Sequence, residues 1–173
     1  MKKAILIYGV IYGILGFLNS YLMINNSVGI WTAMGLSFII FIVLCVLTVF
    51  MYRKESGKSG FKEIFSAMML MGLIGTLITM LVTQVYASSL SAEAITTMEE
   101  NFIDSQLDYY ESLGIPDEQI NELEDTLTEQ FSNMFSLKAQ LISLPISMLF
   151  LAIIALIISL IMKKEENPLG AEV

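Results

Sequence analysis

The sequence predicts an all-α polytopic membrane protein with four transmembrane helices and an extracytoplasmic α-helical hairpin between spans three and four. The 173-residue chain is 55% apolar, whereas soluble domains contain roughly 45–50% apolar residues. The apolar residues gather into four blocks, each about as long as the 17–25 residues that a helix needs to cross a bilayer. A long acidic segment with helical periodicity separates the third block from the fourth.

The first block, residues 4–24, contains no charged side chain. As a helix it reaches roughly 31 Å at about 1.5 Å per residue, so it can span the hydrocarbon core. Lys2 and Lys3 precede it, as basic residues precede the core of a secretory signal peptide. The apolar run is longer than a signal core of about 7–15 residues, however, and no small-residue cleavage site follows it. We therefore expect this block to be retained as the first span.

The other three blocks are residues 31–51, 64–86 and 139–162. Buried core helices of soluble proteins are usually shorter, and a soluble domain of this length cannot enclose four of them. The sequence thus predicts a single membrane domain over residues 1–173. Outside its spans are a loop at 52–63, an acidic helical hairpin at 88–138 and a tail at 163–173.

Basic residues determine the predicted orientation. Eight of the nine lie in three segments that four spans bring to one face of the membrane: Lys2, Lys3, Arg53, Lys54, Lys58, Lys62, Lys163 and Lys164. Cytoplasmic segments carry the excess of lysine and arginine, so the loop at 52–63, the tail and both termini are predicted to be cytoplasmic. This face has eight basic and five acidic residues, a charge of +3, whereas the other has Lys138 and twelve acidic residues, a charge of −11. We expect a multi-pass protein of the inner (cytoplasmic) membrane.

The acidic segment at 88–138 is predicted to fold into two helical arms. Its break is the sequence Leu113-Gly114-Ile115-Pro116, in which a helix-ending glycine precedes a helix-starting proline. Each arm has an apolar stripe at helical spacing, formed by Ile95, Met98, Phe102, Tyr109 and Leu113 in the first and by Ile120, Leu123, Leu127, Phe131 and Met134 in the second. Two points stay open. The hairpin either projects from the membrane or lies over it, and Pro145 either bends the fourth span or marks its first turn.

Polar and small residues inside the spans are candidates for helix contacts. Thr76, Thr79 and Thr83 share one face of the third span by spacing. They either line a polar path or hydrogen-bond a neighbouring helix, and we favour the second reading because such bonds are common between membrane helices. Candidate helix-packing residues are Gly9, Gly13 and Gly16 in the first span and Gly72 and Gly75 in the third. We favour packing within one chain over dimerisation.

No pattern in the sequence predicts chemistry. The chain has no histidine, which removes the commonest general base and the commonest metal ligand. The glycine-rich segment at 56–60 lacks the preceding strand of a phosphate-binding loop, and the acidic residues do not follow the spacing of a calcium loop. Cys45 is alone in an apolar span. We predict no catalytic, cofactor-binding or metal residue and no cofactor, and we expect a protein that is not an enzyme.

The sequence resembles the bacterial domain-of-unknown-function family 4199, a group of small four-span membrane proteins. The likeness covers nearly the whole chain. It rests on Tyr8-Gly9 and Gly13, on the loop from Tyr52-Arg53-Lys54-Glu55 to Glu63-Ile64-Phe65, on the hairpin break from Gly114 to Ile120, and on the Lys163-Lys164-Glu165-Glu166 end of the fourth span. The resemblance implies the same four-span topology and brings no catalytic residue with it.

Two functions are compatible with this pattern. The first is a non-enzymatic interaction, regulatory or scaffold protein that acts through its external hairpin. The alternative is a small channel or carrier with a polar face on the third span. The expected partners are the lipid bilayer and a protein that contacts the hairpin, with no nucleic acid, and the oligomeric state stays open.

Overall fold

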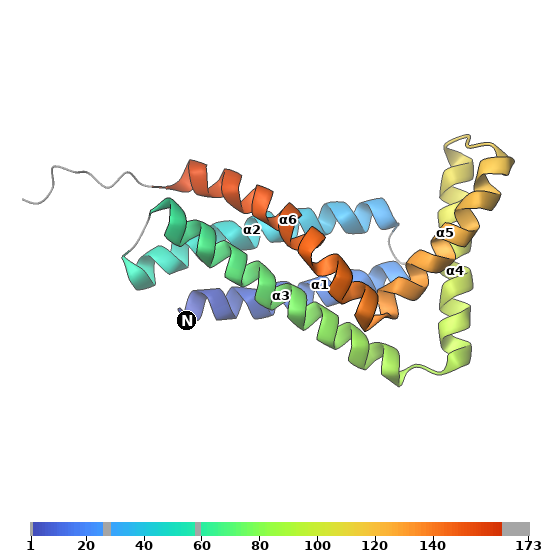
Figure 1. Ribbon diagram of the computed structural model, residues 1–173, viewed down its shortest axis with the longest axis horizontal. Helices are drawn as coiled ribbons and strands as arrows, with labels where there is room; N and C mark the ends of the chain where they lie inside the picture. The colour runs from blue at the N-terminus through green and yellow to red at the C-terminus, as the bar shows by residue number, and fades with distance from the viewer. Residues whose placement is uncertain (1, 26–28, 58–59, 164–173) are drawn as a thin grey trace, which may run out of the picture.

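The computed structural model describes residues 2–25, 29–57 and 60–163, and within them the chain forms six helices and no strand. In chain order these are α1 (Lys3–Ile24), α2 (Ile30–Ser56), α3 (Phe61–Ser89), α4 (Ala92–Ser112), α5 (Asp117–Phe135) and α6 (Leu137–Met162). Figure 1 shows α1, α2, α3 and α6 alongside one another as a bundle, with α4 and α5 at one end of it. The all-α prediction is confirmed.

Four of these helices, α1, α2, α3 and α6, are long and apolar enough to cross a membrane. The expected spans at 4–24, 31–51, 64–86 and 139–162 each fall inside one of them. The helices are longer than the apolar blocks because backbone hydrogen bonding continues into the polar residues at their ends. Helix α2, for example, continues to Ser56. The next residue, Gly57, caps the helix with a φ of 68°, in the left-handed region that glycine adopts without strain.

The bundle is held together by an apolar core in which all four long helices take part. Its fully buried side chains include Phe41 of α2, Ile64 and Met68 of α3, and Ala155 of α6. The most extensive contact in the bundle is between α1 and α3, and α6 packs mainly on α3. Large apolar side chains remain exposed on the outer faces of all four helices. Lipid is a favourable surrounding for such a surface, as water is not.

All the basic residues that the structure describes, except Lys138 at the start of α6, lie at the end of the bundle opposite α4 and α5 (Figure 1). Lys2 and Lys3 begin α1, Arg53 and Lys54 end α2, Lys62 begins α3 and Lys163 follows α6. Lys58 and Lys164 lie outside the described residues.

A backbone-to-side-chain hydrogen bond joins α1 and α2 at this basic end. The Glu55 carboxylate accepts hydrogen bonds from the backbone N–H of Ala4 at 3.2 and 3.4 Å. A carboxylate in this position satisfies one of the free donors at the start of α1 and complements the positive end of the helix dipole. The end of α2 is thereby joined to the start of α1.

The acidic segment forms two helices, α4 and α5, that pack on each other through an apolar cluster. Phe102, Leu127 and Phe131 are its buried side chains, and the Phe102 and Phe131 rings are 5.7 Å apart. The turn between the arms contains Gly114 at a φ of 76°, and Pro116 precedes the first residue of α5. The break therefore lies where the sequence predicts it.

The prediction of a buried apolar stripe is wrong for the second half of the first arm. Tyr109 is 40% exposed and Leu113 is 59% exposed. The buried face instead includes Gln106, and Ile103 and Leu107 pack partly against the cluster. The stripe changes position because the side of a helix that is covered depends on how its partner crosses it, which residue spacing alone does not specify.

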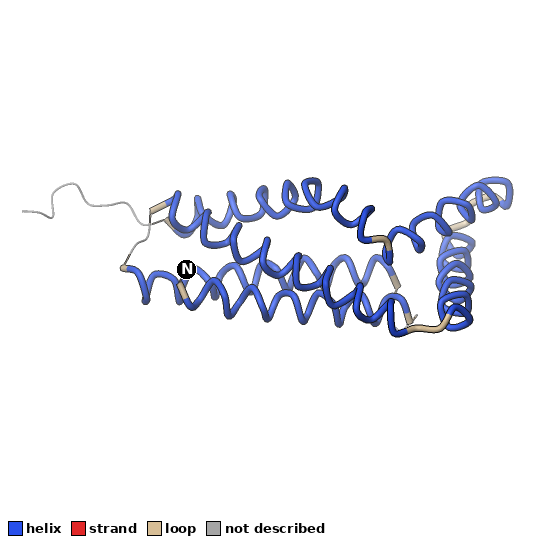
Figure 2. Tube along the Cα trace, turned by 60° about the horizontal axis from the view of Figure 1, so that its bottom comes forward, coloured by secondary structure: helices blue, strands red, loops and turns tan. Residues whose placement is uncertain are grey.

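Helix α4 runs across the end of the bundle and does not extend it (Figures 1 and 2). Contacts with α1 and α3 help to hold the hairpin there. Ile24, at the end of α1, is buried in the same cluster as Phe102 and Phe131. The Gln84 side-chain amide of α3 donates a 2.8 Å hydrogen bond to the Phe135 carbonyl at the end of α5.

The second arm does not run straight into the fourth span. Helix α5 ends at Phe135, and Ser136 caps α6 by accepting a hydrogen bond from the Ala139 N–H at 3.3 Å. Pro145 lies within α6, two turns after its start, and therefore does not mark the first turn. A proline there leaves the carbonyl four residues earlier without its usual helical donor.

Candidate functional site

The floor of the candidate site is built on the close contact between α1 and α3. A methyl group added to Gly9 would lie 2.9 Å from Ile74, and one added to Gly13 would lie 2.6 Å from Ile78. The Thr79 hydroxyl donates a 3.0 Å hydrogen bond to the Gly13 carbonyl. A bulkier residue at position 13 would separate this donor from its acceptor. The two backbones approach this closely only because α1 has glycine at these positions.

The other candidate packing glycines also face neighbouring helices of the same chain. A methyl group on Gly16 would lie 2.6 Å from the Thr79 hydroxyl, and one on Gly72 would lie 3.3 Å from the Phe41 ring. Gly75 faces Tyr12 of α1. All five glycines therefore lie in contacts within the bundle.

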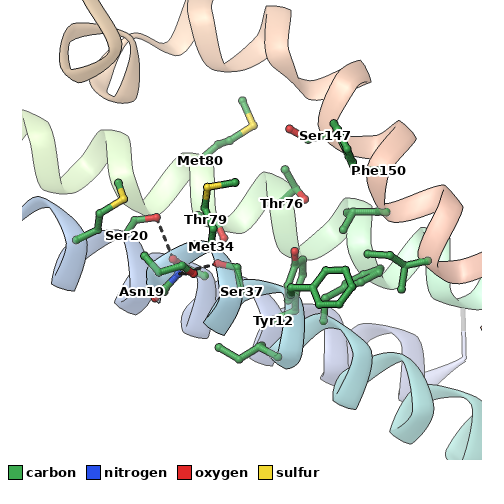
Figure 3. Close-up of a pocket in the computed structure, with 18 of the residues that line it drawn as sticks. Tyr12, Asn19, Ser20, Met34, Ser37, Thr76, Thr79, Met80, Ser147 and Phe150 are labelled. Atoms are coloured by element: carbon green, nitrogen blue, oxygen red, sulfur yellow. Dashed lines mark hydrogen bonds between the residues drawn. The ribbon is translucent and has the colours of Figure 1, made fainter. Parts of the chain in front are cut away.

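A groove of about 770 Å³ lies beside this contact, and its lining extends from Ala33 to Phe41 on α2 and from Ser147 to Ile157 on α6 (Figure 3). All four long helices line it. Its floor includes Tyr12, Asn19 and Thr79, and its rims include Phe38 of α2 and Phe150 of α6, which are 51% and 66% exposed. The groove therefore opens between α2 and α6 onto the apolar outer surface of the bundle. Its volume is within the roughly 300–1,000 Å³ of small-molecule sites.

A second, smaller cavity of about 230 Å³ adjoins the groove and reaches the junction of α5 and α6. Ser20, Thr76, Thr79 and Ser147 line both cavities. Met134 and Gln140 line only the smaller one, beside the base of the hairpin. The two cavities thus follow one polar path from the middle of the bundle to the hairpin.

The predicted polar face of the third span lies along this path. Thr76 and Thr79 line both cavities, and Thr83 lines the smaller one. Thr79 also hydrogen-bonds a neighbouring helix through the Gly13 carbonyl, whereas the Thr76 hydroxyl bonds its own helix at the Gly72 carbonyl, at 2.9 Å. The two interpretations of this face are therefore not exclusive, since Thr79 does both.

Asn19 joins α1 to α2 at the floor of the groove. Its Nδ2 donates to the Ala33 carbonyl at 2.8 Å and to the Ser37 hydroxyl oxygen at 2.6 Å. The residue is 6% exposed, and its Oδ1 has no hydrogen-bond partner among the described residues. A buried carbonyl oxygen without a partner is unfavourable, so this atom is a natural acceptor for a group that enters the groove.

The sequence singled out the threonines but not the residues that meet them from other helices. Ser37 of α2 and Gln140 of α6 share no motif with α3. A serine at a single position in an apolar span carries no signal of its own. Only the helix packing brings these side chains together.

The site offers hydrogen bonding and apolar contact, and no charge. Every residue that lines the two cavities is uncharged. Within the described parts of the chain, no three carboxylate or cysteine side chains come close enough together to hold a metal ion. The lining therefore combines hydroxyl and amide groups with a large apolar surface.

Comparison with known protein families identifies the family of this chain. Residues 7–164, which include nearly all of the four long helices and the whole hairpin, match the family described as protein of unknown function (DUF4199). The chain belongs to the DUF4199 family. The resemblance drawn from the sequence is thereby confirmed for this DUF4199 protein. No curated protein and no solved structure has a significant match to it.

Proposed function

We propose that this DUF4199 protein is a non-enzymatic membrane protein of the interaction or regulatory class, in which the bundle holds the α4–α5 hairpin as a docking element for a basic protein. In this proposal the hairpin lies on the outer side of a bacterial inner membrane, and both termini are cytoplasmic. The basic residues at the opposite end of the bundle support that orientation under the positive-inside rule.

One observation carries the proposal. Glu100, Asp104 and Asp108 are exposed and follow one another at four-residue spacing along α4. Like charges at this spacing repel each other and destabilise a helix. Residues 91–135 contain no lysine or arginine, so the hairpin has no basic residue of its own to compensate. A basic partner would relieve this repulsion.

The hairpin is also suited to binding because it is ordered without a partner. Phe102, Leu127 and Phe131 are buried against one another and against Ile24, and Gln84 donates a hydrogen bond that joins the end of α5 to α3. A preorganised surface loses less entropy on association than a flexible one. Its negative field would also increase the rate at which a basic protein reaches it.

The docking surface is tested by removing charge from one arm at a time. One variant carries Glu100→Gln, Asp104→Asn and Asp108→Asn on α4. The matched control carries Glu124→Gln, Asp125→Asn and Glu129→Gln on α5, which removes the same charge from other exposed positions. Proteins crosslinked to each variant in intact membranes are then identified and quantified.

We expect the α4 variant to lose a basic partner that the wild type and the α5 variant retain. That partner should also dissociate as salt is raised from about 0.05 to 0.5 M, since exposed charges are screened beyond a Debye length of roughly 10 Å at 0.1 M. An identical set of crosslinked proteins for all three chains would contradict the proposal.

The orientation has its own measurement. A cysteine introduced as Ser112→Cys at the hairpin should react with a membrane-impermeant maleimide in intact cells, and one introduced as Lys62→Cys should not. The native Cys45 is buried in the bundle and serves as the background. Labelling of the Lys62→Cys chain alone would reverse the orientation.

A second candidate, a small channel or carrier, is favoured by the threonine face that lines the groove. Ion flux into liposomes that contain the purified protein would test it. If the path along α3 conducts, replacing Thr76, Thr79 and Thr83 together by valine should abolish flux. Flux that survives all three substitutions would exclude this path.

A further inference from the structure

The groove has a gradient of polarity along the axis of the bundle. At the hairpin end its lining includes Asn19 and Ser20 together with Met23 and Met34, whereas the α6 lining beyond Ser147, as far as Ile157, is entirely apolar. On α2 the lining runs from Ala33, near the start of the helix at the hairpin end, to Phe41, which is eight residues or about 12 Å and less than half of the ~30 Å hydrocarbon core of a bilayer. On this side the groove therefore lies within the leaflet nearest the hairpin.

Five of the hydroxyl groups that line the two cavities can act toward a ligand only as acceptors. Each donates its proton to a backbone carbonyl, at distances of 2.9–3.2 Å: Ser20 to Gly16, Thr76 to Gly72, Thr79 to Gly13, Ser143 to Gln140 and Ser147 to Ser143. A carbonyl oxygen can only accept, so these hydrogen bonds fix where the five protons are. What the hydroxyls can offer a ligand is their oxygen lone pairs.

Two buried amide oxygens add to this set of acceptors. Asn19 Oδ1 and Gln140 Oε1 have no hydrogen-bond partner among the residues that the structure describes, and both residues line the cavities. Their amide nitrogens are already engaged, by Ala33 and Ser37 for Asn19 and by the Met134 carbonyl for Gln140. The polar end is thus rich in acceptors, two of them unsatisfied, and a ligand that fits it must donate hydrogen bonds.

We propose that the groove binds an uncharged lipid with a free hydroxyl group, taken laterally from the leaflet on the hairpin side. The hydroxyl donates to the acceptors around Asn19 and Thr76, and the hydrocarbon chain lies between α2 and α6 along Phe41 and Ile157. Entry is direct because the groove opens between two rims that face lipid. The inference is independent of any partner of the hairpin.

The absence of charge in the lining selects against other lipids. A phosphate group taken into the groove would lose hydration without meeting a lysine or arginine side chain there. An ester lipid without a free hydroxyl group has no proton to donate to Asn19 Oδ1 or Gln140 Oε1. Recognition therefore requires both a neutral head group and a donor.

Competition binding to the full-length protein in detergent micelles tests this. Radiolabelled 1,2-dioleoylglycerol is the probe, and the competitors are the unlabelled compound, its methyl ether at the free hydroxyl, and dioleoyl phosphatidic acid. We expect saturable binding, with both altered lipids competing about tenfold more weakly, since roughly one good hydrogen bond is lost or one charge is buried. Equal competition by the methyl ether, or the lack of saturable binding, would overturn the proposal.

A double variant tests where the hydroxyl group of the lipid binds. Thr76→Val with Ser147→Ala removes two acceptors, and because both hydroxyls bond carbonyls of their own helix, no contact between helices is lost. Thr97→Val with Ser112→Ala makes the same chemical changes at exposed positions of α4, where both hydroxyls also bond their own helix.

The groove variant should bind 1,2-dioleoylglycerol three- to tenfold more weakly, on the order of one weakened hydrogen bond, and should no longer distinguish it from the methyl ether. The α4 control should behave as the wild type does. Discrimination that is unchanged in the groove variant would overturn the placement of the hydroxyl. Unaltered circular dichroism of both variants shows that each chain is folded, and neither outcome depends on whether a protein binds the hairpin.

Discussion

Replacing Gly13 with alanine is expected to force α1 away from α3. The added methyl group would lie 2.6 Å from the Ile78 side chain and 2.9 Å from the Gly75 carbonyl oxygen, whereas ordinary van der Waals contact begins at 3.4 Å. Ile78 is branched at the carbon concerned and the carbonyl belongs to the backbone, so neither can move aside alone. The helices must therefore separate by about 0.8 Å at this point.

The size of the effect follows from two losses. Overpacking of a close contact costs roughly 1–3 kcal/mol. The separation also lengthens the 3.0 Å hydrogen bond from Thr79 to the Gly13 carbonyl, and bonds of this kind between membrane helices contribute about 0.6 kcal/mol on average. Alanine favours the helix over glycine by roughly 1 kcal/mol, so we expect the free energy of unfolding to fall by about 1–3 kcal/mol.

Unfolding of the purified protein by increasing amounts of sodium dodecyl sulfate, followed by circular dichroism, measures this change. Gly35→Ala is the matched control, because Gly35 lies in α2 and has nothing within 4 Å of an added methyl group. That control should unfold at the same point as the wild type or slightly later, since alanine favours helix over glycine. If Gly13→Ala and Gly35→Ala unfold together, the α1–α3 contact is not the close one described above.

Three further changes have expected outcomes. Asn19→Leu should lower the free energy of unfolding by about 1–2 kcal/mol in the same assay, because the Ala33 carbonyl loses its α1 donor; no loss would show that this bond contributes nothing. Phe131→Ala should weaken the hairpin by about 3–5 kcal/mol by opening a cavity beside Phe102. Hydrogen exchange should then show lost protection in α4 and α5 and unchanged protection in α1, and uniform loss would argue against a separate hairpin core. Gly114→Val should destabilise the hairpin by about 1 kcal/mol or more, since its φ of 76° strains a β-branched residue; exchange rates equal to the wild type in the turn would refute this.

Much of the architecture could be predicted from residue order because it depends on local properties. Hydrocarbon-length apolar blocks predict helices that can cross a membrane wherever they fold. Gly114 and Pro116 end one arm and begin the next because their own backbone preferences require it. The spacing of the α1 glycines, at four and then three residues, predicts that they share one helix face that another helix can approach. The spacing does not predict which helix contacts them.

The failures concern side chains whose surroundings come from elsewhere in the chain. Tyr109 and Leu113 continue the helical period of the first arm, yet they are exposed because the crossing of α5 covers the face of Gln106 instead. The groove was not predictable at all. Side chains of all four long helices line it, and only the packing of these helices brings them together.

Periodicity, charge and backbone preference, all readable in the order of residues, determined that this protein is helical, that four of its helices suit a bilayer and that an acidic hairpin joins the last two. The tertiary structure decided which hydroxyls meet, because Asn19, Thr76 and Ser147 lie in three different helices. Local preferences act over one or two helical turns, whereas a binding surface depends on how separate helices pack, and that packing is a property of the whole chain.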